Sequence, residues 1–278
     1  MGGDDLGADD DYFLEPVVAK NDDNDDDAYS NDDDDDDDVV VKRALDHDNN
    51  DDDDTEPAAK KPKKLTNENV LIEAGCGIES RSVQEQVSFL TTSLQHYSML
   101  EATTIDEKEE TTNDESSTWK LTPKQIATSS KQSLGERLRD VVSLKRLKKH
   151  RQARSPAVVI VCQSARRAVA VLKELNDLRL RAAKLFPKNA EVPQQVTQLR
   201  QSPFPLAVGT PHRLVALAQH GKGLAFEHTQ LVVLDTFVSK KQYTVCTLPD
   251  TAADTMALLR EHVLPEMKTN KNLRIAFF

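Results

Sequence analysis

A threonine, a proline and an arginine follow the apolar run that ends at Gly209, and together they could bind a phosphate group. These residues are Thr210, Pro211 and Arg213. Free N–H groups at a helix start bind phosphate oxygens, a threonine hydroxyl adds a hydrogen bond, and an arginine supplies charge. The same residues also suit a plain helix start, because threonine is a good N-cap and proline favours the first turn.

A second polar group follows the apolar run at 157–162. Ligands of open α/β sheets bind at the carboxyl ends of strands, so we expect both groups to lie at one sheet edge and to contact RNA. The predicted RNA-binding set is therefore Gln163, Ser164, Arg166, Arg167, Thr210, Pro211 and Arg213. The alternative for the two neighbouring arginines is simple exposure on a surface helix.

A lone carboxylate, Asp235, ends a third apolar run. Carboxylates at strand ends can hold a divalent cation, but a single one more often serves as a helix cap or a hydrogen-bond anchor. The seven histidines show no metal-ligand spacing, and Cys76, Cys162 and Cys246 are too widely separated for a CxxC site. We therefore predict no metal site and no nucleophile.

A phosphate loop of the form GxxxxGK[ST] is absent from the 278 residues. Such a loop uses backbone N–H groups and a lysine for the phosphates, and a serine or threonine for magnesium. Between Trp119 and Val158, where the loop would belong, the only glycine is Gly135. We therefore expect neither a nucleotide cofactor nor catalytic activity.

Apolar runs alternate with helical patterns from residue 119 onward, which predicts an α/β fold with one parallel sheet and flanking helices. The expected strands are 157–162, 183–186, 206–209, 231–235 and 273–278. The expected helices are 134–151, 164–181, 191–200, 211–220 and 251–263. The first of these helices ends in Lys145, Arg146, Lys148, Lys149 and Arg151, which either contact RNA phosphates or form an exposed helix end.

Charge divides the chain into an acidic and a basic part. Residues 1–56 hold 25 acidic and 3 basic residues, so we expect a disordered acidic tail over 1–57. From Ser116 onward there are 27 basic and 11 acidic residues, which favours a polyanionic partner. No secretory signal and no membrane-spanning run is recognisable, and a monomer is the default expectation.

Three segments connect the acidic tail to the α/β domain at 119–278. Segment 58–66 resembles a nuclear localisation signal through Lys60, Lys61, Lys63 and Lys64, although a solvated linker is the alternative. Segment 67–100 predicts an amphipathic helix over 82–100, with Ser82 and Glu85 as its capping box. Segment 101–118 is rich in Thr, Glu, Asp and Ser and predicts a linker.

The polar groups at the strand ends resemble motifs of DEAD-box helicases. Residues 210–213, TPHR, are similar to the TPGR motif, with His212 in place of glycine. Residues 161–168 occupy the position of the PTREL motif, and Asp235 matches the first acid of DEAD. The glutamate that would polarise the attacking water is replaced by Thr236. This resemblance implies a single RecA-like, P-loop NTPase-like lobe without its phosphate loop, a pseudoenzyme.

A closer resemblance is to the Cms-type ribosomal small-subunit homologue family. It rests on VVIVCQSARRAVAVLKEL, KLFPKN, AVGTPHRL, LVVLD and the terminal FF, over residues 119–278. The resemblance implies a nuclear and nucleolar protein without known catalytic activity. It also implies association with the large pre-ribosome that contains the U3 small nucleolar RNA.

Three functions remain open. The preferred one is a module that binds pre-rRNA, small nucleolar RNA or ribosome assembly proteins. The second is an NTPase with an unorthodox nucleotide site, against which the missing loop and glutamate count. The third is an acidic, chaperone-like scaffold whose self-repelling carboxylates are neutralised by basic ribosomal proteins.

Overall fold

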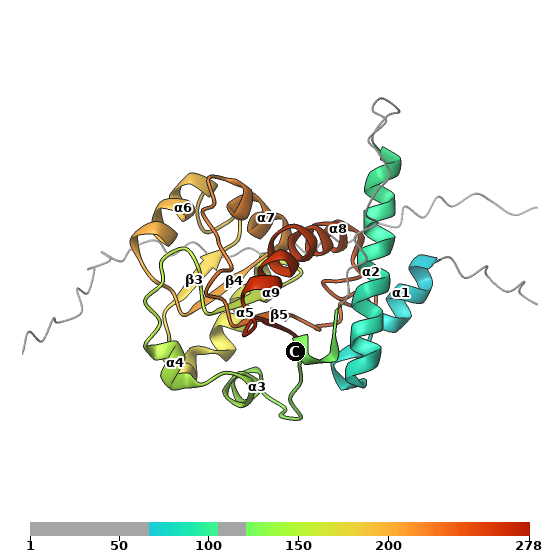
Figure 1. Ribbon diagram of the computed structural model, residues 1–278, viewed down its shortest axis with the longest axis horizontal. Coiled ribbons are helices and arrows are strands. Elements are labelled where there is room, and N and C mark those ends of the chain that lie inside the picture. Colours follow the sequence, from blue (N-terminus) through green and yellow to red (C-terminus); the bar gives the residue numbers. More distant parts are fainter. Residues whose placement is uncertain (1–66, 105–120) are drawn as a thin grey trace, which may run out of the picture. The chain divides into compact units, whose positions relative to one another are not determined.

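The computed structural model describes residues 67–104 and 121–278, which belong to one compact unit (Figure 1). The predicted acidic tail, 1–57, lies outside the described residues. So do Lys60, Lys61, Lys63 and Lys64 of the predicted localisation signal.

One six-stranded sheet forms the centre of the fold, and all its strand pairs are parallel. The strand order is β1-β6-β5-β2-β4-β3. The strands are β1 (Ile126–Ala127), β2 (Val158–Val161), β3 (Ala182–Leu185), β4 (Leu206–Gly209), β5 (Leu231–Leu234) and β6 (Arg274–Phe277). The predicted α/β class is confirmed, and the arrangement is consistent with a RecA-like lobe. The sequence did not predict β1, which has only two residues.

The strands form where β-branched and leucine side chains run without interruption, because both faces of the sheet are covered. In β2 all four residues are buried. Val159 and Val161 belong to one hydrophobic cluster, and Val158 and Ile160 belong to the other. This alternation is the two-residue period of a strand, and it places a separate core on each side of the sheet.

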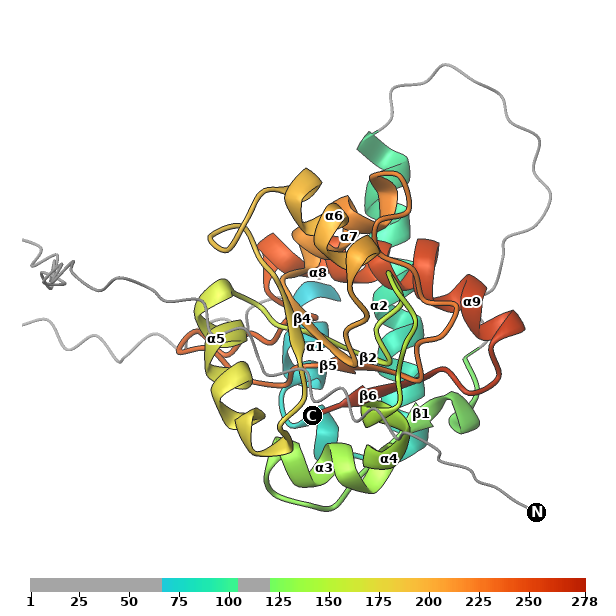
Figure 2. The ribbon, with the colours of Figure 1, turned by 90° about the vertical axis from the view of Figure 1, so that its left-hand side faces the viewer.

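The first face is covered by α3 (Leu134–Val141), α4 (Leu144–Lys148) and α5 (Ala165–Glu174) (Figure 2). The single helix predicted over 134–151 was wrong, because Val142 is extended and Ser143 starts a second helix. The helix predicted over 164–181 also ends early, at Glu174. A short 3-10 turn, η3 (Asn176–Leu178), follows it and ends at Arg179, whose φ is 50°.

The second face is covered by α6 (Val192–Gln201), α7 (Pro211–Gln219), α8 (Pro249–Leu258) and α9 (Leu264–Thr269). A five-residue π-helical segment, η4 (Leu259–Val263), joins α8 to α9. Pro265 lies at the start of α9 and has no N–H to donate, so the helix changes its hydrogen-bond pattern just before it.

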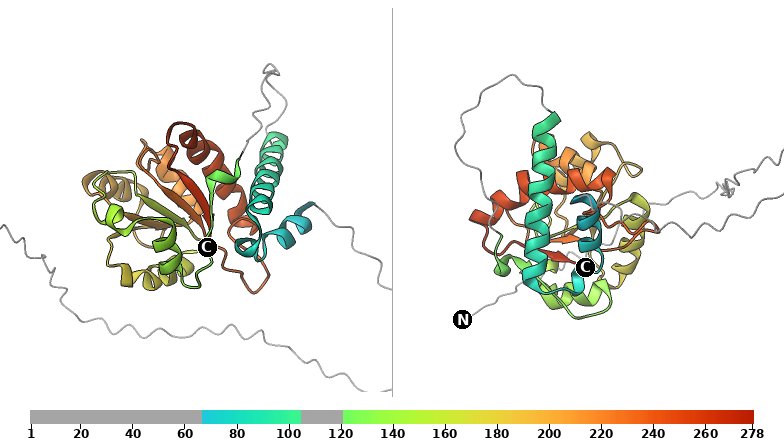
Figure 3. Two further views of the ribbon diagram at one scale, coloured as in Figure 1. Left: turned by 60° about the horizontal axis from the view of Figure 1, so that its bottom comes forward. Right: turned by 90° about the vertical axis from the view of Figure 1, so that its right-hand side faces the viewer.

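The helical segment before the domain packs against this second face (Figure 3). It contains α1 (Asn67–Gly75), η1 (Ile78–Ser80) and α2 (Val83–Thr104). The predicted capping box is confirmed: the Ser82 N–H donates to Glu85 Oε2 at 2.9 Å, and the Glu85 N–H donates to Ser82 Oγ at 3.3 Å. This bonding lowers the pKa of Glu85.

The apolar stripe of α2 enters the main core. Leu90 and Leu94 are fully buried, and the ring of Phe89 meets that of Phe277 edge-on at 5.9 Å between centroids. The helix continues to Thr104, four residues into the segment predicted as a linker. None of the helices in 67–104 and 121–278 combines the length and the apolar character needed to cross a membrane.

Candidate nucleic-acid interface

Parallel pairing brings the predicted site residues to one edge of the sheet. Val161 of β2 lies opposite Gly209 of β4 and Leu234 of β5, so these three strands end level with one another. The residues that follow them therefore begin side by side. At β4 the chain passes so close to β3 that a Cβ on Gly209 would lie 2.5 Å from the Leu185 carbonyl oxygen.

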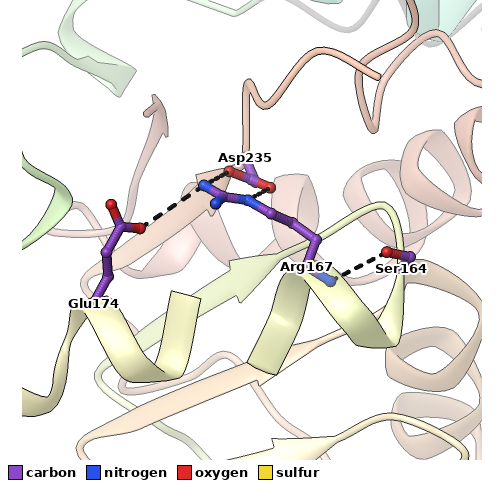
Figure 4. Close-up of polar contacts among 4 residues, drawn as sticks. All are labelled: Ser164, Arg167, Glu174 and Asp235. Atoms are coloured by element: carbon purple, nitrogen blue, oxygen red, sulfur yellow. Dashed lines mark hydrogen bonds and ion pairs between the residues drawn. The ribbon is translucent and has the colours of Figure 1, made fainter. Parts of the chain in front are cut away.

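Arg167 and Asp235 form a bidentate ion pair at this edge (Figure 4). Arg167 donates from Nε to Asp235 Oδ2 at 2.8 Å and from Nη2 to Oδ1 at 2.9 Å. The Asp235 side chain is only 3% exposed. Such paired hydrogen bonds between charged groups are the strong, geometrically specific kind. Both carboxylate oxygens of Asp235 thus accept hydrogen bonds from an arginine of the same chain.

Other groups hold Arg167 in place. Its guanidinium lies 4.9 Å from the centroid of the Phe237 ring and 3.9 Å from Glu174 Oε2. The hydrogen bonds to Asp235 raise the pKa of Arg167 above its ordinary value. Burial, with Asp235 adding to it, raises the pKa of the Cys162 thiol well above its usual range. Burial therefore disfavours the thiolate form of Cys162.

Ser164 and Thr210 both precede helices but behave differently. Ser164 Oγ accepts a hydrogen bond from the Arg167 N–H at 3.2 Å, so it caps α5 while remaining exposed. Thr210 is in the N-cap position of α7, yet its side chain makes no capping bond. Pro211 is buried in the first turn of α7. The Thr210 hydroxyl is therefore not used for capping, whereas the Ser164 hydroxyl is.

The three arginines of the predicted RNA-binding set differ in how their guanidinium groups are bound. Arg213 donates from Nη1 to the Ala190 carbonyl and to Gln195 Oε1, which ties α7 to α6 and to the loop before it. Arg167 is bound to Asp235. Arg166 is exposed and has no ion pair with a carboxylate of the described residues. Of the predicted arginine contacts to RNA, only Arg166 has a guanidinium that is not held by described neighbours.

Gln163 lies between the buried Cys162 and the exposed Ser164. Its Oε1 is buried and has no hydrogen-bond partner among the described residues. A buried amide oxygen without a partner is unusual in folded proteins and marks a point where a donor could bind. No sequence pattern predicted this burial, because the residue is polar and follows a strand.

Residues 128–133 form the loop that joins β1 to α3. These residues contain no glycine. Ser133 Oγ accepts from the Glu136 N–H at 3.3 Å, so a side chain of the chain itself caps this helix. Within the described ranges, no group of three or more His, Cys, Asp or Glu side chains is placed to hold a metal ion.

Sequence reasoning missed the partner of Asp235. The two residues are separated by 68 positions, so no local pattern links them. The available signal was an unmatched acid at the end of β5 together with an arginine in the first turn of the helix after the adjacent β2.

Comparison with known proteins identifies the family. Residues 129–278 match the model of the CMS1 family, described as the U3-containing 90S pre-ribosomal complex subunit. The match covers more than half of the 278 residues. The chain belongs to the CMS1 family. The matched region begins in the loop after β1 and includes both the Arg167–Asp235 pair and the helix start at Thr210.

Individual relatives are similar to a part of the chain. Protein CMSS1 of Danio rerio is 31% identical over 120 residues, which cover 42% of this chain and 41% of that protein. Protein CMSS1 of Homo sapiens is 29% identical over 134 residues, 47% of each chain. Protein CMS1 of Chaetomium thermophilum is 28% identical over 125 residues, 44% of this chain and 49% of that protein. Each alignment spans less than half of the relative.

Proposed function

We propose that this CMS1-family chain is a non-catalytic assembly factor of the early small-subunit pre-ribosome, acting in the nucleus and nucleolus. The description of the family as a 90S pre-ribosomal complex subunit supports this assignment. The basic charge from residue 116 onward supports contact with pre-rRNA or with RNA-bound assembly proteins. On this proposal the α/β domain is a degenerate helicase lobe that binds and does not hydrolyse.

The ion pair between Arg167 and Asp235 is the observation that carries the non-catalytic role. In the DEAD motif that this strand end resembles, the first acid helps to hold the magnesium ion of the bound nucleotide. Here both oxygens of Asp235 accept hydrogen bonds from Arg167. Binding a cation would require breaking a buried pair and leaving Arg167 without its partner, which is costly. Residues 128–133 also lack the glycines that would bring N–H groups to a phosphate.

RNA contact at the carboxyl-terminal edge rests on the groups that remain accessible there. Ser164 and Arg166 are exposed, and the Thr210 hydroxyl is not used for capping. These groups lie at helix starts, where N–H groups favour phosphate. Arg167 and Arg213 act in this proposal as positioning residues, because their guanidinium groups are bound within the protein.

ATP turnover tests the non-catalytic role. The full chain and an Arg167→Gln variant, which frees Asp235, are assayed with magnesium and ATP. We expect no turnover by either, because releasing the carboxylate does not restore a phosphate loop. Turnover by the wild type that disappears in Asp235→Asn would overturn the proposal in favour of an unorthodox NTPase.

Crosslinking with sequencing of bound RNA tests the partner. We compare the wild type with a Thr210→Ala, Arg166→Gln double variant and with a matched control, Thr197→Ala, Arg139→Gln, whose residues lie on the exposed surfaces of α6 and α3. We expect small-subunit precursor RNA to be enriched by the wild type and the control and reduced in the double variant. No specific enrichment by the wild type would replace RNA binding with docking on assembly proteins.

A further inference from the structure

A second polar surface lies at the opposite, amino-terminal edge of the sheet. It is formed by α4 and by the loops that lead into β2, β3, β4, β5 and β6. Two hollows of 540 and 410 Å³ open there, and His150 and Arg151 line both of them. The two hollows adjoin at these residues, and we call them together the basic groove.

Positive charge dominates the basic groove. Its lysines and arginines are Lys145, Arg146, Lys148, Lys149, Arg151, Arg179 and Arg181. The only carboxylate that lines it is Glu227. None of these cations forms an ion pair with a carboxylate of the described residues. Unpaired like charges gathered in a hollow attract an anionic partner, because the low-dielectric walls focus the field.

The wall that the two hollows share is held by internal hydrogen bonds. His150 is buried, and its Nε2 lies 2.8 Å from the Ser155 carbonyl oxygen. Burial lowers the pKa of His150. Arg151 donates to the carbonyl oxygens of Lys148 and His150, so its side chain stabilises the turn after α4. Of the groove's cations, Lys149 and Arg151 belong to this turn.

The surroundings of the basic groove favour RNA over a protein. A protein interface has an apolar centre. The exposed large apolar side chains of the described residues are Val70, Met99, Val169 and Phe237, and none of them lines either hollow. Side-chain amides of Gln152, Gln230 and Asn272 line the larger hollow instead, whereas the Asn270 amide donates to the Glu227 and Thr229 carbonyl oxygens. Amide donors beside lysine and arginine are typical of contacts to phosphate and sugar.

We infer that the basic groove binds the phosphate backbone of RNA, as a second contact surface on the edge opposite the helicase-like motifs. The inference rests on the proposed pre-ribosomal function, which supplies the RNA. Binding here is directed at the backbone and tolerates any sequence, because the cations present no fixed arrangement for reading base edges. The two edges of one domain then contact two RNA segments or two parts of one.

A pair of charge-matched variants of the full chain tests the inference. Arg146→Gln, Lys148→Gln, Lys149→Gln removes one arginine and two lysines from the basic groove. Arg166→Gln, Lys131→Gln, Lys188→Gln removes the same charges from the exposed carboxyl-terminal edge. Binding of a short single-stranded RNA is measured by fluorescence anisotropy over a series of salt concentrations.

The groove variant should bind about tenfold more weakly, and its log–log salt slope should become shallower by about 2, on the rule of about 0.7 per phosphate for single strands. Retained affinity with an unchanged slope overturns the inference. If only the edge variant loses affinity, the proposed function stands and the groove inference fails. If only the groove variant loses affinity, the inference stands and RNA contact at the other edge fails. If the wild type does not bind the RNA, both the groove inference and RNA contact at the carboxyl-terminal edge fail.

A gain of affinity provides a second measurement that misfolding cannot mimic. Glu227→Gln removes the single carboxylate of the basic groove, and its side chain makes no hydrogen bond or ion pair with the described residues. We expect about twofold tighter RNA binding, since a repulsive charge near the phosphates is lost. Weaker or unchanged binding contradicts the inference.

Discussion

The two edges of the sheet both carry arginines, but they hold them differently. At the carboxyl-terminal edge Arg167 and Arg213 are bound to groups of the protein itself. At the amino-terminal edge Arg151 also donates to carbonyl oxygens, whereas the Arg146 and Arg179 side chains have no hydrogen-bond or ion-pair partner among the described residues. An arginine in a motif-like position is therefore weaker evidence for RNA contact than an unpaired one in a hollow. Motif resemblance locates an edge, and the internal bonds decide which side chains are available.

The largest expected effect is on stability at the carboxyl-terminal edge. Asp235→Ala should destabilise the domain by about 3 kcal/mol, because Arg167 would keep its charge in a half-buried site with only the exposed Glu174 carboxylate nearby. Urea unfolding followed by circular dichroism measures the loss. The double variant Arg167→Gln, Asp235→Asn leaves no unpaired charge and should lose less. An equal loss in both would show that the pairing itself is unimportant.

Arg213 should also affect stability and not RNA affinity. Arg213→Met keeps an unbranched stem but removes the bonds to Ala190 and Gln195, so we expect a loss of about 1.5 kcal/mol. The matched variant Arg166→Met should change the unfolding free energy by less than about 0.5 kcal/mol, because Arg166 is an exposed surface residue. Weaker RNA binding by a fully folded Arg213→Met protein would reverse the assignment of roles.

Ser164 and Thr210 offer a finer test at the same edge. Ser164→Ala should cost about 1 kcal/mol, because it removes the cap of α5. Thr210→Ala should leave stability nearly unchanged, because the Thr210 side chain does not cap α7. Thermal unfolding of the two variants compares them directly. A larger loss for Thr210→Ala would show that its hydroxyl has a structural role after all.

The smallest effect concerns pH at the amino-terminal edge. Burial lowers the pKa of His150, so the unfolded chain takes up a proton at a higher pH than the folded one. The associated stability is present above the usual histidine pKa of about 6.5 and is lost as the pH falls below it. His150→Gln should weaken this pH dependence in urea unfolding. Burial also lowers the pKa of His262, so this residue should account for part of the pH dependence that remains in the variant.

The sequence predicted the elements that have a strong periodic pattern. Strand β4 was predicted with its observed bounds, and α2 with its capping box, because uninterrupted apolar runs and helical spacing are local signals. The break between α3 and α4 was missed, because the apolar residues keep a helical spacing across both helices. Only the extended backbone at Val142 separates them from one another. Strand β1 was missed because two residues carry no period.

The candidate site was predictable as a location but not as a set of contacts. Parallel strands must end at one edge, so the grouping of polar residues there follows from topology. The bond between Arg167 and Asp235 depends on helix α5 facing the end of β5, which no local pattern encodes. The basic groove likewise gathers Arg179 and Arg181 beside α4 from a distant part of the chain.

The packing of α2 has a consequence for the order in which the chain folds during synthesis. Phe89 of α2 rests on Phe277 of β6, and Ile126 of β1 has its register partner at Ile275 of the same strand. Both early elements therefore emerge from the ribosome long before the strand that they contact. Contacts between such distant residues close slowly. The core should thus be completed only after β6 has been made, and until then Phe89 of α2 lacks its partner Phe277.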